Sequence, residues 1–353
     1  MPSEQPGIDA LGGWPSVLNR LLDGHGLTSD EARTVLDAVL DGTATPAITA
    51  ALHVAQRAKG ETAEEIRGLA DALVAHAEKV PIDPSGLIDT CGTGGDRHGT
   101  INVSTVAALV AAGAGARVCK HGNRAASSDC GSADVLEALG VVIDAGAEVV
   151  AACIEEAGIG FCFAPRFHPA MRHVGPIRRE LGVPTVFNFL GPLANPAGVR
   201  RQVLGVSDPT MAERIAEVLA ARHAERAFVV HGADGLDELT TTGLTEVLEV
   251  VDGEISRWAV DPERLGLRRA TLHEIKGGDA TQNAAVTRRI LDGEPGAHRD
   301  VVVLNAAAAL VVAGIATDLA AGVEAATVAL DDGRAAAALD RLVATSRSVG
   351  GTT

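Results

Sequence analysis

A glycine-rich stretch that joins an apolar run to a helical run constrains this chain most. Residues 89–105 read DTCGTGGDRHGTINVST, with glycines at positions 92, 94, 95 and 99. The apolar pair Leu87 and Ile88 predicts the end of a buried strand, and the Ala/Val/Leu run 106–112 predicts a helix. Glycines let backbone N–H groups approach an anion closely, and a helix N-terminus adds unpaired donors and a positive dipole end. The stretch therefore predicts a phosphate cradle built from main chain.

Two standard phosphate fingerprints do not fit this stretch. The dinucleotide motif G-x-G-x-x-G requires glycine where Arg97 stands, and the nucleotide P-loop requires lysine where Thr100 stands. A plain glycine-rich turn, with Asp96 as a turn residue and Asn102 as a helix cap, is the alternative interpretation.

A second group of anion donors follows the next apolar pair, residues 118–119. Lys120 is one of only four lysines in the chain, and we expect it in a loop with His121, Arg124 and the serines at 127 and 128. Residues 131–134, GSAD, then predict the start of a helix over 135–139. Two such loops after neighbouring strands favour a phosphate site over a solvated turn.

The composition bounds the class of protein. The chain has 353 residues, of which 46% are hydrophobic and 22% charged, enough for two domains with a sizeable core. Its formal net charge of −16 argues against nucleic acid and anionic membranes as partners. We see no secretory signal and no apolar run of membrane-spanning length, so we expect a soluble, cytoplasmic protein. The five cysteines show no C-x-x-C spacing and indicate reduced thiols, none of them a nucleophile.

Residues 14–80 carry helical periodicity. Thr28 with Glu31 and Thr62 with Glu65 predict capping boxes, and Thr45 followed by proline predicts another helix start.

From residue 87 onward, short apolar runs alternate with Ala/Leu-rich helical segments, which predicts a mainly parallel sheet flanked by helices. The expected strands contain residues 88, 118–119, 141–142, 161–163, 228–230 and 301–304. Residues 247–260, interrupted by Asp252 and Gly253, predict an antiparallel hairpin.

Two further groups of charged residues carry chemistry. Asp237 and Glu238 follow the strand at 228–230, and adjacent carboxylates there suit magnesium holding substrate phosphates better than a solvated loop does. The basic segment 166–179 has histidines at 168 and 173, a spacing that suits no metal pair, so its arginines favour a carboxylate.

Several motifs occur in the order found in anthranilate phosphoribosyltransferases, which the chain resembles from about Trp14 to its end. They are DTCGTGGD (89–96), TxNxST (100–105), KHGNR (120–124), GSADVLEALG (131–140), FHPAM (167–171), FNxLGPLxNP (187–196), HGxDGLDE (231–238), GGD (277–279) and LNAA (304–307). One departure is Pro184, where many relatives carry arginine.

The resemblance implies an α/β fold class: a small N-terminal all-helical domain plus a larger domain with a mainly parallel sheet flanked by helices. We expect a helical domain over residues 1–82, joined in space by helices from about 169–190, and a phosphoribosyl diphosphate-binding domain over 83–353. The implied reaction transfers the 5-phosphoribosyl group to the amine of anthranilate in tryptophan biosynthesis, with two magnesium ions per subunit in a homodimer.

The resemblance also implies roles for individual residues, and no acid or base catalyst among them. Phosphoribosyl diphosphate would contact Gly92, Gly95, Asp96, Thr100, Asn102, Val103, Ser104, Thr105, Lys120, His121, Gly122, Asn123, Arg124, Ala125, Ala126, Ser127, Ser128 and Ser132. Anthranilate would contact Gly92, Asn123 and Arg178, with His121 and His168 as neighbours, and magnesium would bind Ser104, Asp237 and Glu238. Arg172 and Arg179 would be solvated.

Two alternatives are kept. A pyrimidine nucleoside phosphorylase-like enzyme also handles a ribosyl C1 atom but does not need the acidic pair. A non-catalytic nucleic-acid-binding relative is disfavoured by the net charge and by the absence of tyrosine.

Overall fold

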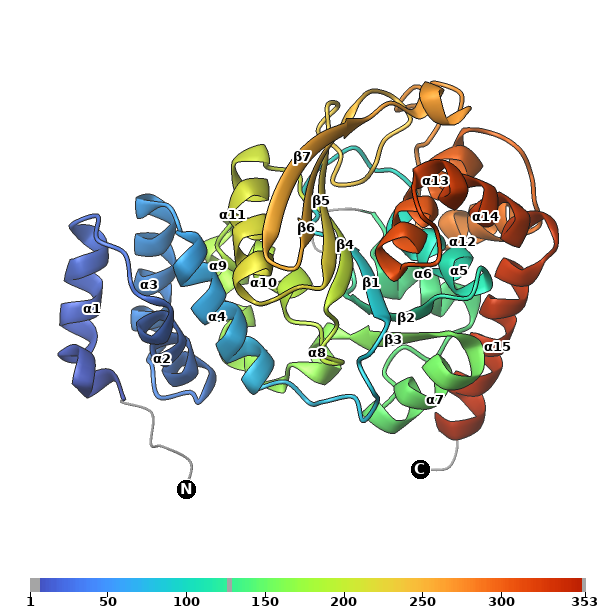
Figure 1. Ribbon diagram of the computed structural model, residues 1–353. Coiled ribbons are helices and arrows are strands. Elements are labelled where there is room, and N and C mark those ends of the chain that lie inside the picture. Colours follow the sequence, from blue (N-terminus) through green and yellow to red (C-terminus); the bar gives the residue numbers. More distant parts are fainter. Residues whose placement is uncertain (1–6, 126–128, 351–353) are drawn as a thin grey trace. The chain divides into compact units, whose positions relative to one another are not determined.

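The computed structural model describes residues 7–125 and 129–350 (Figure 1). The chain divides into two compact units. The first holds the chain up to Glu78 together with Phe167–Ala194, and the second holds Lys79–Arg166 and the chain from Asn195 onward. The expected fold class, a helical bundle plus an α/β domain, is confirmed.

The first unit is helical. Its elements are η1 (Ile8–Leu11), α1 (Gly13–Leu22), α2 (Ser29–Leu40), α3 (Pro46–Lys59), α4 (Ala63–Ala75), η2 (Pro169–His173), α9 (Gly175–Leu181), α10 (Phe187–Leu190) and η3 (Gly191–Leu193). Helices α2 and α4 form both expected capping boxes, in which the threonine hydroxyl accepts the N–H of the glutamate and the glutamate accepts the N–H of the threonine. Helix α3 begins at Pro46 after Thr45, as expected.

The second unit is built on one seven-stranded sheet. The strands are β1 (Leu87–Gly92), β2 (Arg117–Gly122), β3 (Ile159–Phe163), β4 (Arg201–Gly205), β5 (Arg226–Gly232), β6 (Thr245–Val251) and β7 (Glu254–Val260), in the order β3-β2-β1-β4-β5-β6-β7. Strands β1 to β5 pair in parallel, and β6 and β7 add an antiparallel hairpin. Asp252 and Gly253 both have positive φ, as a two-residue type I′ turn requires.

Helices cover the sheet on both sides (Figure 1). The helices of this unit are α5 (Val103–Gly113), α6 (Ser132–Leu139), α7 (Ala147–Ala157), α11 (Pro209–Ala221), η4 (Pro262–Leu265), α12 (Ala280–Leu291), α13 (Ala297–Ala313), α14 (Leu319–Asp331) and α15 (Arg334–Gly350), some of which pack on other helices rather than on the sheet, while α8 (Ala164–Phe167) leads into the first unit. Helices α5 and α13 pack on β1, whereas α11 packs on β5 and β6. Within the described residues, no helix combines the length and the apolar character that crossing a membrane requires.

Two expected strands are wrong and one strand was missed. Residues 301–304 belong to helix α13, which is buried on all sides, so its apolar run imitates a buried strand. Residues 141–142 follow the left-handed Gly140 that ends α6 and pair with no strand; Val141 packs into the core. Strand β4, only five residues long, lies at the centre of the sheet between β1 and β5.

The order of the strands reverses beside β1. The chain runs from β1 outward to β2 and β3, then returns to β4 on the other side of β1 and continues to β5. Ligands of open α/β sheets bind beyond the carboxyl ends of strands at such a reversal. Strands β1, β2, β4 and β5 each end in glycine at that edge, and Gly92 pairs in register with Gly205.

Candidate functional site

The glycine-rich loop follows β1 at the reversal of strand order. It leads from Gly92 to helix α5, passes Gly94, Gly95 and Gly99 with positive φ, and is tied to β4 because the Thr93 N–H donates to the carbonyl of Gly205 at 2.9 Å. The loop and the N-terminus of α5 therefore lie where the predicted cradle should be.

A distant segment supports the far end of this loop. The N–H of Gly277 donates to the carbonyl of Gly99 at 2.8 Å, and Thr100 forms an antiparallel bridge with Lys276. Asn102 does not cap α5 with its side chain; its amide oxygen instead accepts Asn283 Nδ2 at 2.9 Å. The loop is thus braced by side chains and backbone rather than left as a free turn.

The acidic pair Asp237 and Glu238 lies against the cradle. Oδ2 of Asp237 accepts the N–H of Gly94 at 2.6 Å, and Oε1 of Glu238 accepts the N–H of Ser104 at 3.1 Å. A Cβ on Gly92 would lie 2.3 Å from Asp237 Oδ2, so only glycine allows this approach. The structure brings together the three residues expected to bind magnesium.

The pKa values of these carboxyls show electrostatic crowding. Burial and the nearby Asp96 carboxylate raise the pKa of Asp237 to about 7. Burial and the Asp237 carboxylate raise the pKa of Glu238 to about 8. A cation beside the pair would relieve this repulsion.

Lys120 lies within strand β2 and is only 2% exposed, so its expected place in a loop is wrong. Its ammonium donates to the carbonyl of Thr90 and to Ser104 Oγ at 3.3 Å. It also opposes the effect of burial, which raises the pKa of Asp89. Lys120 is a buried cation that joins β1, β2 and the first turn of α5.

Asp89 of β1 connects this strand to the end of β2 and to Asn195. Its carboxylate accepts the N–H of His121 at 3.2 Å and Asn195 Nδ2 at 2.9 Å. Gly122 then passes Ser132 so closely that a Cβ would lie 2.2 Å from the hydroxyl oxygen. These contacts set the direction in which the chain leaves β2.

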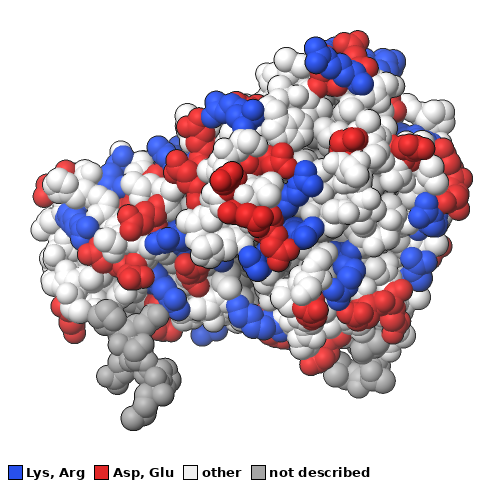
Figure 2. Space-filling model, viewed as in Figure 1, with Lys and Arg blue, Asp and Glu red and all other residues white. Residues whose placement is uncertain are grey.

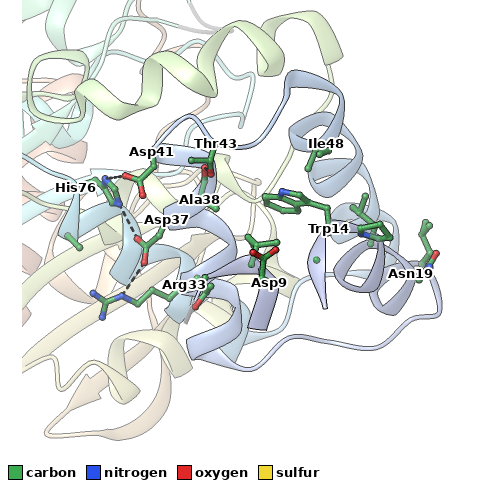
Figure 3. A pocket seen from close by; sticks show the side chains of 18 residues that line it. Asp9, Trp14, Asn19, Arg33, Asp37, Ala38, Asp41, Thr43, Ile48 and His76 are labelled. Atoms are coloured by element: carbon green, nitrogen blue, oxygen red, sulfur yellow. Dashed lines mark hydrogen bonds and ion pairs between the residues drawn. The ribbon is translucent and has the colours of Figure 1, made fainter. Parts of the chain in front are cut away.

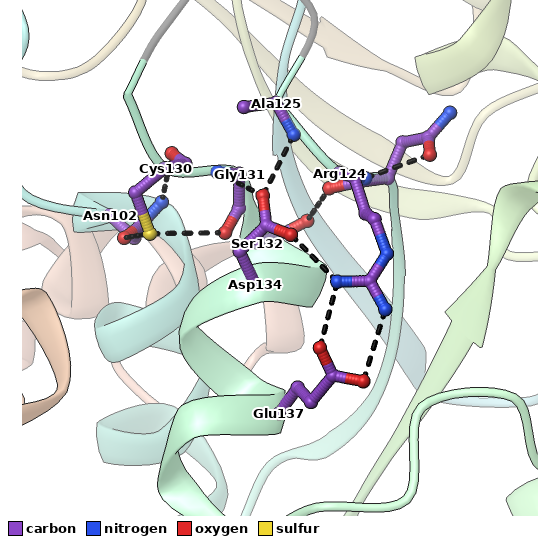
Figure 4. Close-up of polar contacts among 9 residues, drawn as sticks. Asn102, Arg124, Ala125, Cys130, Gly131, Ser132, Asp134 and Glu137 are labelled. Carbon is purple, nitrogen blue, oxygen red and sulfur yellow. Dashed lines mark hydrogen bonds and ion pairs between the residues drawn. The ribbon is translucent and has the colours of Figure 1, made fainter. Parts of the chain in front are cut away.

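Segment 123–125 is folded by Asp134 of helix α6 (Figure 4). Asp134 Oδ2 accepts the N–H groups of Ala125 and Gly131, both at 2.9 Å. Arg124 is exposed and pairs with Asp134 and Glu137 at 2.8 Å, so its charge is neutralised within the chain. Asn123 is exposed, and Ala126, Ser127 and Ser128 lie outside the described residues.

The remaining expected contacts of the phosphoribosyl donor lie around the loop. Gly95 is exposed and Asp96 half-buried, with Oδ1 of Asp96 accepting the N–H of His98 at 3.2 Å. Val103 and Thr105 are buried in the first turn of α5. Ser132 Oγ donates to the carbonyl of Asn123 at 3.2 Å.

Arg178 belongs to the helical unit, on α9. It is half-buried, and its Nη2 donates to Asn188 Oδ1 at 3.3 Å. His168, also in this unit, is 4% exposed, whereas Pro184 and the neighbouring Arg179 are exposed. Gly92 and Asn123, the other residues expected to contact anthranilate, belong to the α/β unit.

A cavity of about 1190 Å³ lies within the helical unit (Figure 3). It is lined by Trp14, Leu18 and Ile48 and by a polar group in which Asp37 contacts His76 at 3.1 Å. None of the residues expected to bind substrate or magnesium lines it, so the chemistry argued above does not depend on it.

The cysteines offer no competing chemistry. All five are buried, and burial raises the pKa of the Cys91 thiol well above its usual range.

Across residues 7–125 and 129–350, no group of three or more His, Cys, Asp or Glu side chains is arranged to hold a metal ion. A site of two carboxylates and a hydroxyl suits an ion that also takes phosphate oxygens.

Comparison with known proteins decides the family. Residues 15–77 match the glycosyl transferase family helical bundle domain, and residues 85–336 match the glycosyl transferase family α/β domain. An anthranilate phosphoribosyltransferase from Anaeromyxobacter is 55% identical over 331 residues, covering 94% of this chain and 98% of that protein. The chain belongs to the anthranilate phosphoribosyltransferase family.

Solved structures of anthranilate phosphoribosyltransferases show the same fold. The Thermus thermophilus enzyme matches with a TM-score of 0.88 at 47% identity, covering 94% of this chain and 99% of that one. The Saccharomyces cerevisiae enzyme, solved in complex with PRPP (phosphoribosyl diphosphate) and Mg, matches with a TM-score of 0.87 at 28% identity, covering 95% and 98%.

Some residues that shape this anthranilate phosphoribosyltransferase site were not found from the sequence. Asn305 of α13 makes two hydrogen bonds to the backbone of Leu239, the residue after Glu238. Its side chain accepts the N–H of Leu239 at 3.0 Å and donates to the carbonyl of Leu239 at 2.8 Å. Gly205 passes so close to Asp237 that a Cβ would lie 1.5 Å from the carbonyl oxygen. In the sequence, the LNAA motif could have pointed to Asn305, and the glycine after the apolar residues 203–204 could have pointed to Gly205.

Figure 2 shows the charged side chains on one face of the protein. On the visible face of the described residues, acidic and basic side chains are interspersed rather than separated into one basic surface. A net charge of −16 repels a polyphosphate, so local donors must provide any attraction for one.

Proposed function

We propose that this chain transfers the 5-phosphoribosyl group of phosphoribosyl diphosphate to the amine of anthranilate, a reaction of tryptophan biosynthesis. The products are N-(5-phosphoribosyl)anthranilate and diphosphate. The observation that carries the proposal is the acidic pair resting on backbone donors of the glycine-rich loop, at the reversal of strand order. Membership of the family gives this geometry its substrates.

Backbone donors and Lys120 support the binding of the phosphoribosyl donor. The loop 92–102, the first turn of α5 and segment 120–125 follow or adjoin the ends of β1 and β2, which supports the donor contacts carried over from the family for the described residues of this set. Main-chain N–H groups fixed in position stabilise the charge that develops on a leaving diphosphate. Lys120, held within the sheet, adds a positive charge beside Ser104.

The residues present fit magnesium. Asp237 and Glu238 carry raised pKa values because burial and like charges disfavour their ionised forms, and Ser104 adds a hydroxyl beside them. We infer two ions per subunit held by these three residues and substrate oxygens. Bound magnesium would neutralise charge on the diphosphate and so make it a better leaving group. The yeast relative was solved with Mg and PRPP.

Anthranilate would be held by Arg178 through its carboxylate, with Gly92 and Asn123 as further contacts. Arginine pairs with carboxylates through two parallel hydrogen bonds. A structure of the yeast relative contains 4-fluoroanthranilate, which carries such a carboxylate. We infer a homodimer as the assembled form.

The chemistry needs no general base. Cleavage of the ribose C1–O bond gives the sugar oxocarbenium character, and the neutral arylamine need only be held in line for attack at C1. Formation of the C1–N bond leaves the nitrogen with a proton to lose, which the departing diphosphate or solvent can accept, so no residue of the chain is assigned as acid or base.

Fluorescence of anthranilate tests the proposal. We expect the signal to fall when the protein, phosphoribosyl diphosphate and magnesium are all present, with stoichiometric release of diphosphate, and to stay constant with EDTA. A constant signal with folded protein and magnesium would refute the acceptor. Phosphorolysis of uridine or thymidine would instead favour the nucleoside phosphorylase alternative.

A further inference from the structure

The surroundings of Arg178 in the helical unit show how its charge is kept available. Burial lowers the pKa of the Arg178 guanidinium, so the charged form is partly desolvated. Its one hydrogen-bond acceptor among the described residues is Asn188 Oδ1, and no described carboxylate lies within ion-pair distance of it. Other arginines of the chain, such as Arg124, pair with carboxylates. Arg178 therefore retains a positive charge that no acidic side chain neutralises.

Asn188 is fixed in the orientation that meets Arg178. Its Oδ1 accepts the N–H of Thr185 at 3.2 Å as well as Arg178 Nη2, and its own N–H donates to the carbonyl of Thr185 at 3.0 Å. Both Arg178 Nη2 and the Thr185 N–H donate to the same amide oxygen. If the Asn188 amide were turned over, its NH2 group would face these two donors, so only the orientation with the oxygen toward them satisfies both. The turn over 185–188 thus holds a neutral acceptor against the guanidinium.

Phe187 restricts the guanidinium by a second contact. The Arg178 Cζ atom lies 5.6 Å from the centroid of the Phe187 ring, within cation–π range. Phe187 is 6% exposed, and its ring also contacts His53 of helix α3, with ring centroids 4.9 Å apart and ring planes inclined by 51°. The aromatic ring is therefore held by α3 while it contacts the arginine of α9.

We propose that Phe187 and Asn188 are positioning residues that orient the Arg178 guanidinium toward the carboxylate of the aromatic acceptor. This inference rests on the proposed function. Asn188 accepts one N–H of Arg178 Nη2, and the other N–H donors of the guanidinium are left for a carboxylate. Both partners are uncharged, so they orient Arg178 without competing for its charge.

Asn188→Asp separates this role from a structural one. The new carboxylate would pair with Arg178 and compete with the substrate carboxylate. We expect the KM for anthranilate to rise by about ten- to hundredfold, the size of a hydrogen bond to a charged group. The KM for phosphoribosyl diphosphate should stay unchanged. Arg179→Ala, at an exposed neighbouring position on α9, is the matched control and should leave both constants unchanged.

Aniline, an arylamine without a carboxylate, supplies the decisive comparison. With aniline as the acceptor, Asn188→Asp and the wild type should react at the same rate, because there is no substrate carboxylate for the new aspartate to compete with. Asn188→Ala introduces no charge and should raise the KM for anthranilate by about three- to tenfold, a weaker effect because only orientation is lost. It also serves if the aspartate variant fails to fold, which circular dichroism would detect.

The outcomes distinguish this inference from the proposed function. An active wild type in which neither variant changes the KM for anthranilate overturns the positioning role alone. Equal rises for both substrates, or an equal loss with aniline, also overturn it because they indicate a general structural defect. A wild type that releases no diphosphate with anthranilate overturns the proposed function and this inference with it.

Discussion

Gly92→Ala would place a methyl group inside the contact between the phosphate loop and the acidic pair. The new Cβ would lie 2.3 Å from Oδ2 and 2.9 Å from Cγ of Asp237. The φ angle of Gly92 is not positive, so alanine adds no backbone strain there. To restore ordinary contact distances, the carboxylate must move by about 1 Å or more. The substitution therefore displaces a proposed magnesium ligand and leaves the strand pairing intact.

Two estimates of the effect agree. The displaced carboxylate would lose the hydrogen bond from the Gly94 N–H, now 2.6 Å long, and such bonds to charged groups contribute about 1.5–3 kcal/mol. A displacement of about 1 Å in an active site costs about 100-fold in rate, which equals about 2.7 kcal/mol. We expect kcat/KM for phosphoribosyl diphosphate to fall by about 100-fold, with more magnesium needed for half-maximal rate.

Steady-state rates measured over a magnesium titration test this reasoning. Gly243→Ala is the control, because its Cβ would meet nothing closer than Ala233 at 3.7 Å, and it should behave as wild type. Gly205→Ala should be more damaging, because its Cβ would meet the Asp237 carbonyl oxygen at 1.5 Å. A Gly92→Ala protein with wild-type kcat/KM and magnesium dependence would refute the argument.

Three further predictions concern stability and reactivity. Burial, and to a lesser extent Arg178, lowers the pKa of His53 to about 4 in the folded protein, so protonation at acid pH favours the unfolded state. Between pH 7 and pH 5 the wild type should lose about 2 kcal/mol of unfolding free energy, measured by urea denaturation, and His53→Gln should not lose it. Equal losses would contradict this. Thr62→Ala removes the hydroxyl that accepts the Glu65 N–H and should cost about 1 kcal/mol in the same assay, whereas no change would show that this cap is dispensable. The five buried thiols should resist a disulfide reagent until urea unfolds the chain; fast labelling of native protein would contradict their burial.

The sequence predicted local structure well where the signal was local. The capping boxes at Thr28 and Thr62 and the hairpin turn at Asp252 each depend on residues within four positions, and all three are confirmed. The strand expected at 301–304 failed because a helix buried on every side has the same unbroken apolar pattern as a buried strand. Helix length distinguishes the two, and the run continues to residue 313.

The candidate site was predictable in its components more than in its arrangement. The glycine loop and the acidic pair carry motifs, but their contact depends on the chain returning from β3 to β4 and on to β5, which no local pattern specifies. Lys120 was expected in a loop because it follows the apolar pair 118–119 and begins a run of polar and basic residues. Its burial is explained by acceptors from β1 and α5 that are 30 and 16 residues away.

The placement of charge at the site explains why so acidic a chain would hold a polyphosphate. Arg124 is neutralised by Asp134 and Glu137, and the buried Asp89 and Glu238 offset part of the charge that Lys120 contributes, so these two cations alone would not attract a polyphosphate. Most of the attraction would then come from oriented backbone N–H groups and from a cation beside Asp237 and Glu238. Both sources act only at close range, which allows the site to coexist with a net charge of −16. We therefore expect the site to prefer a magnesium-bound diphosphate, because an anion without the cation would be repelled by the two carboxylates.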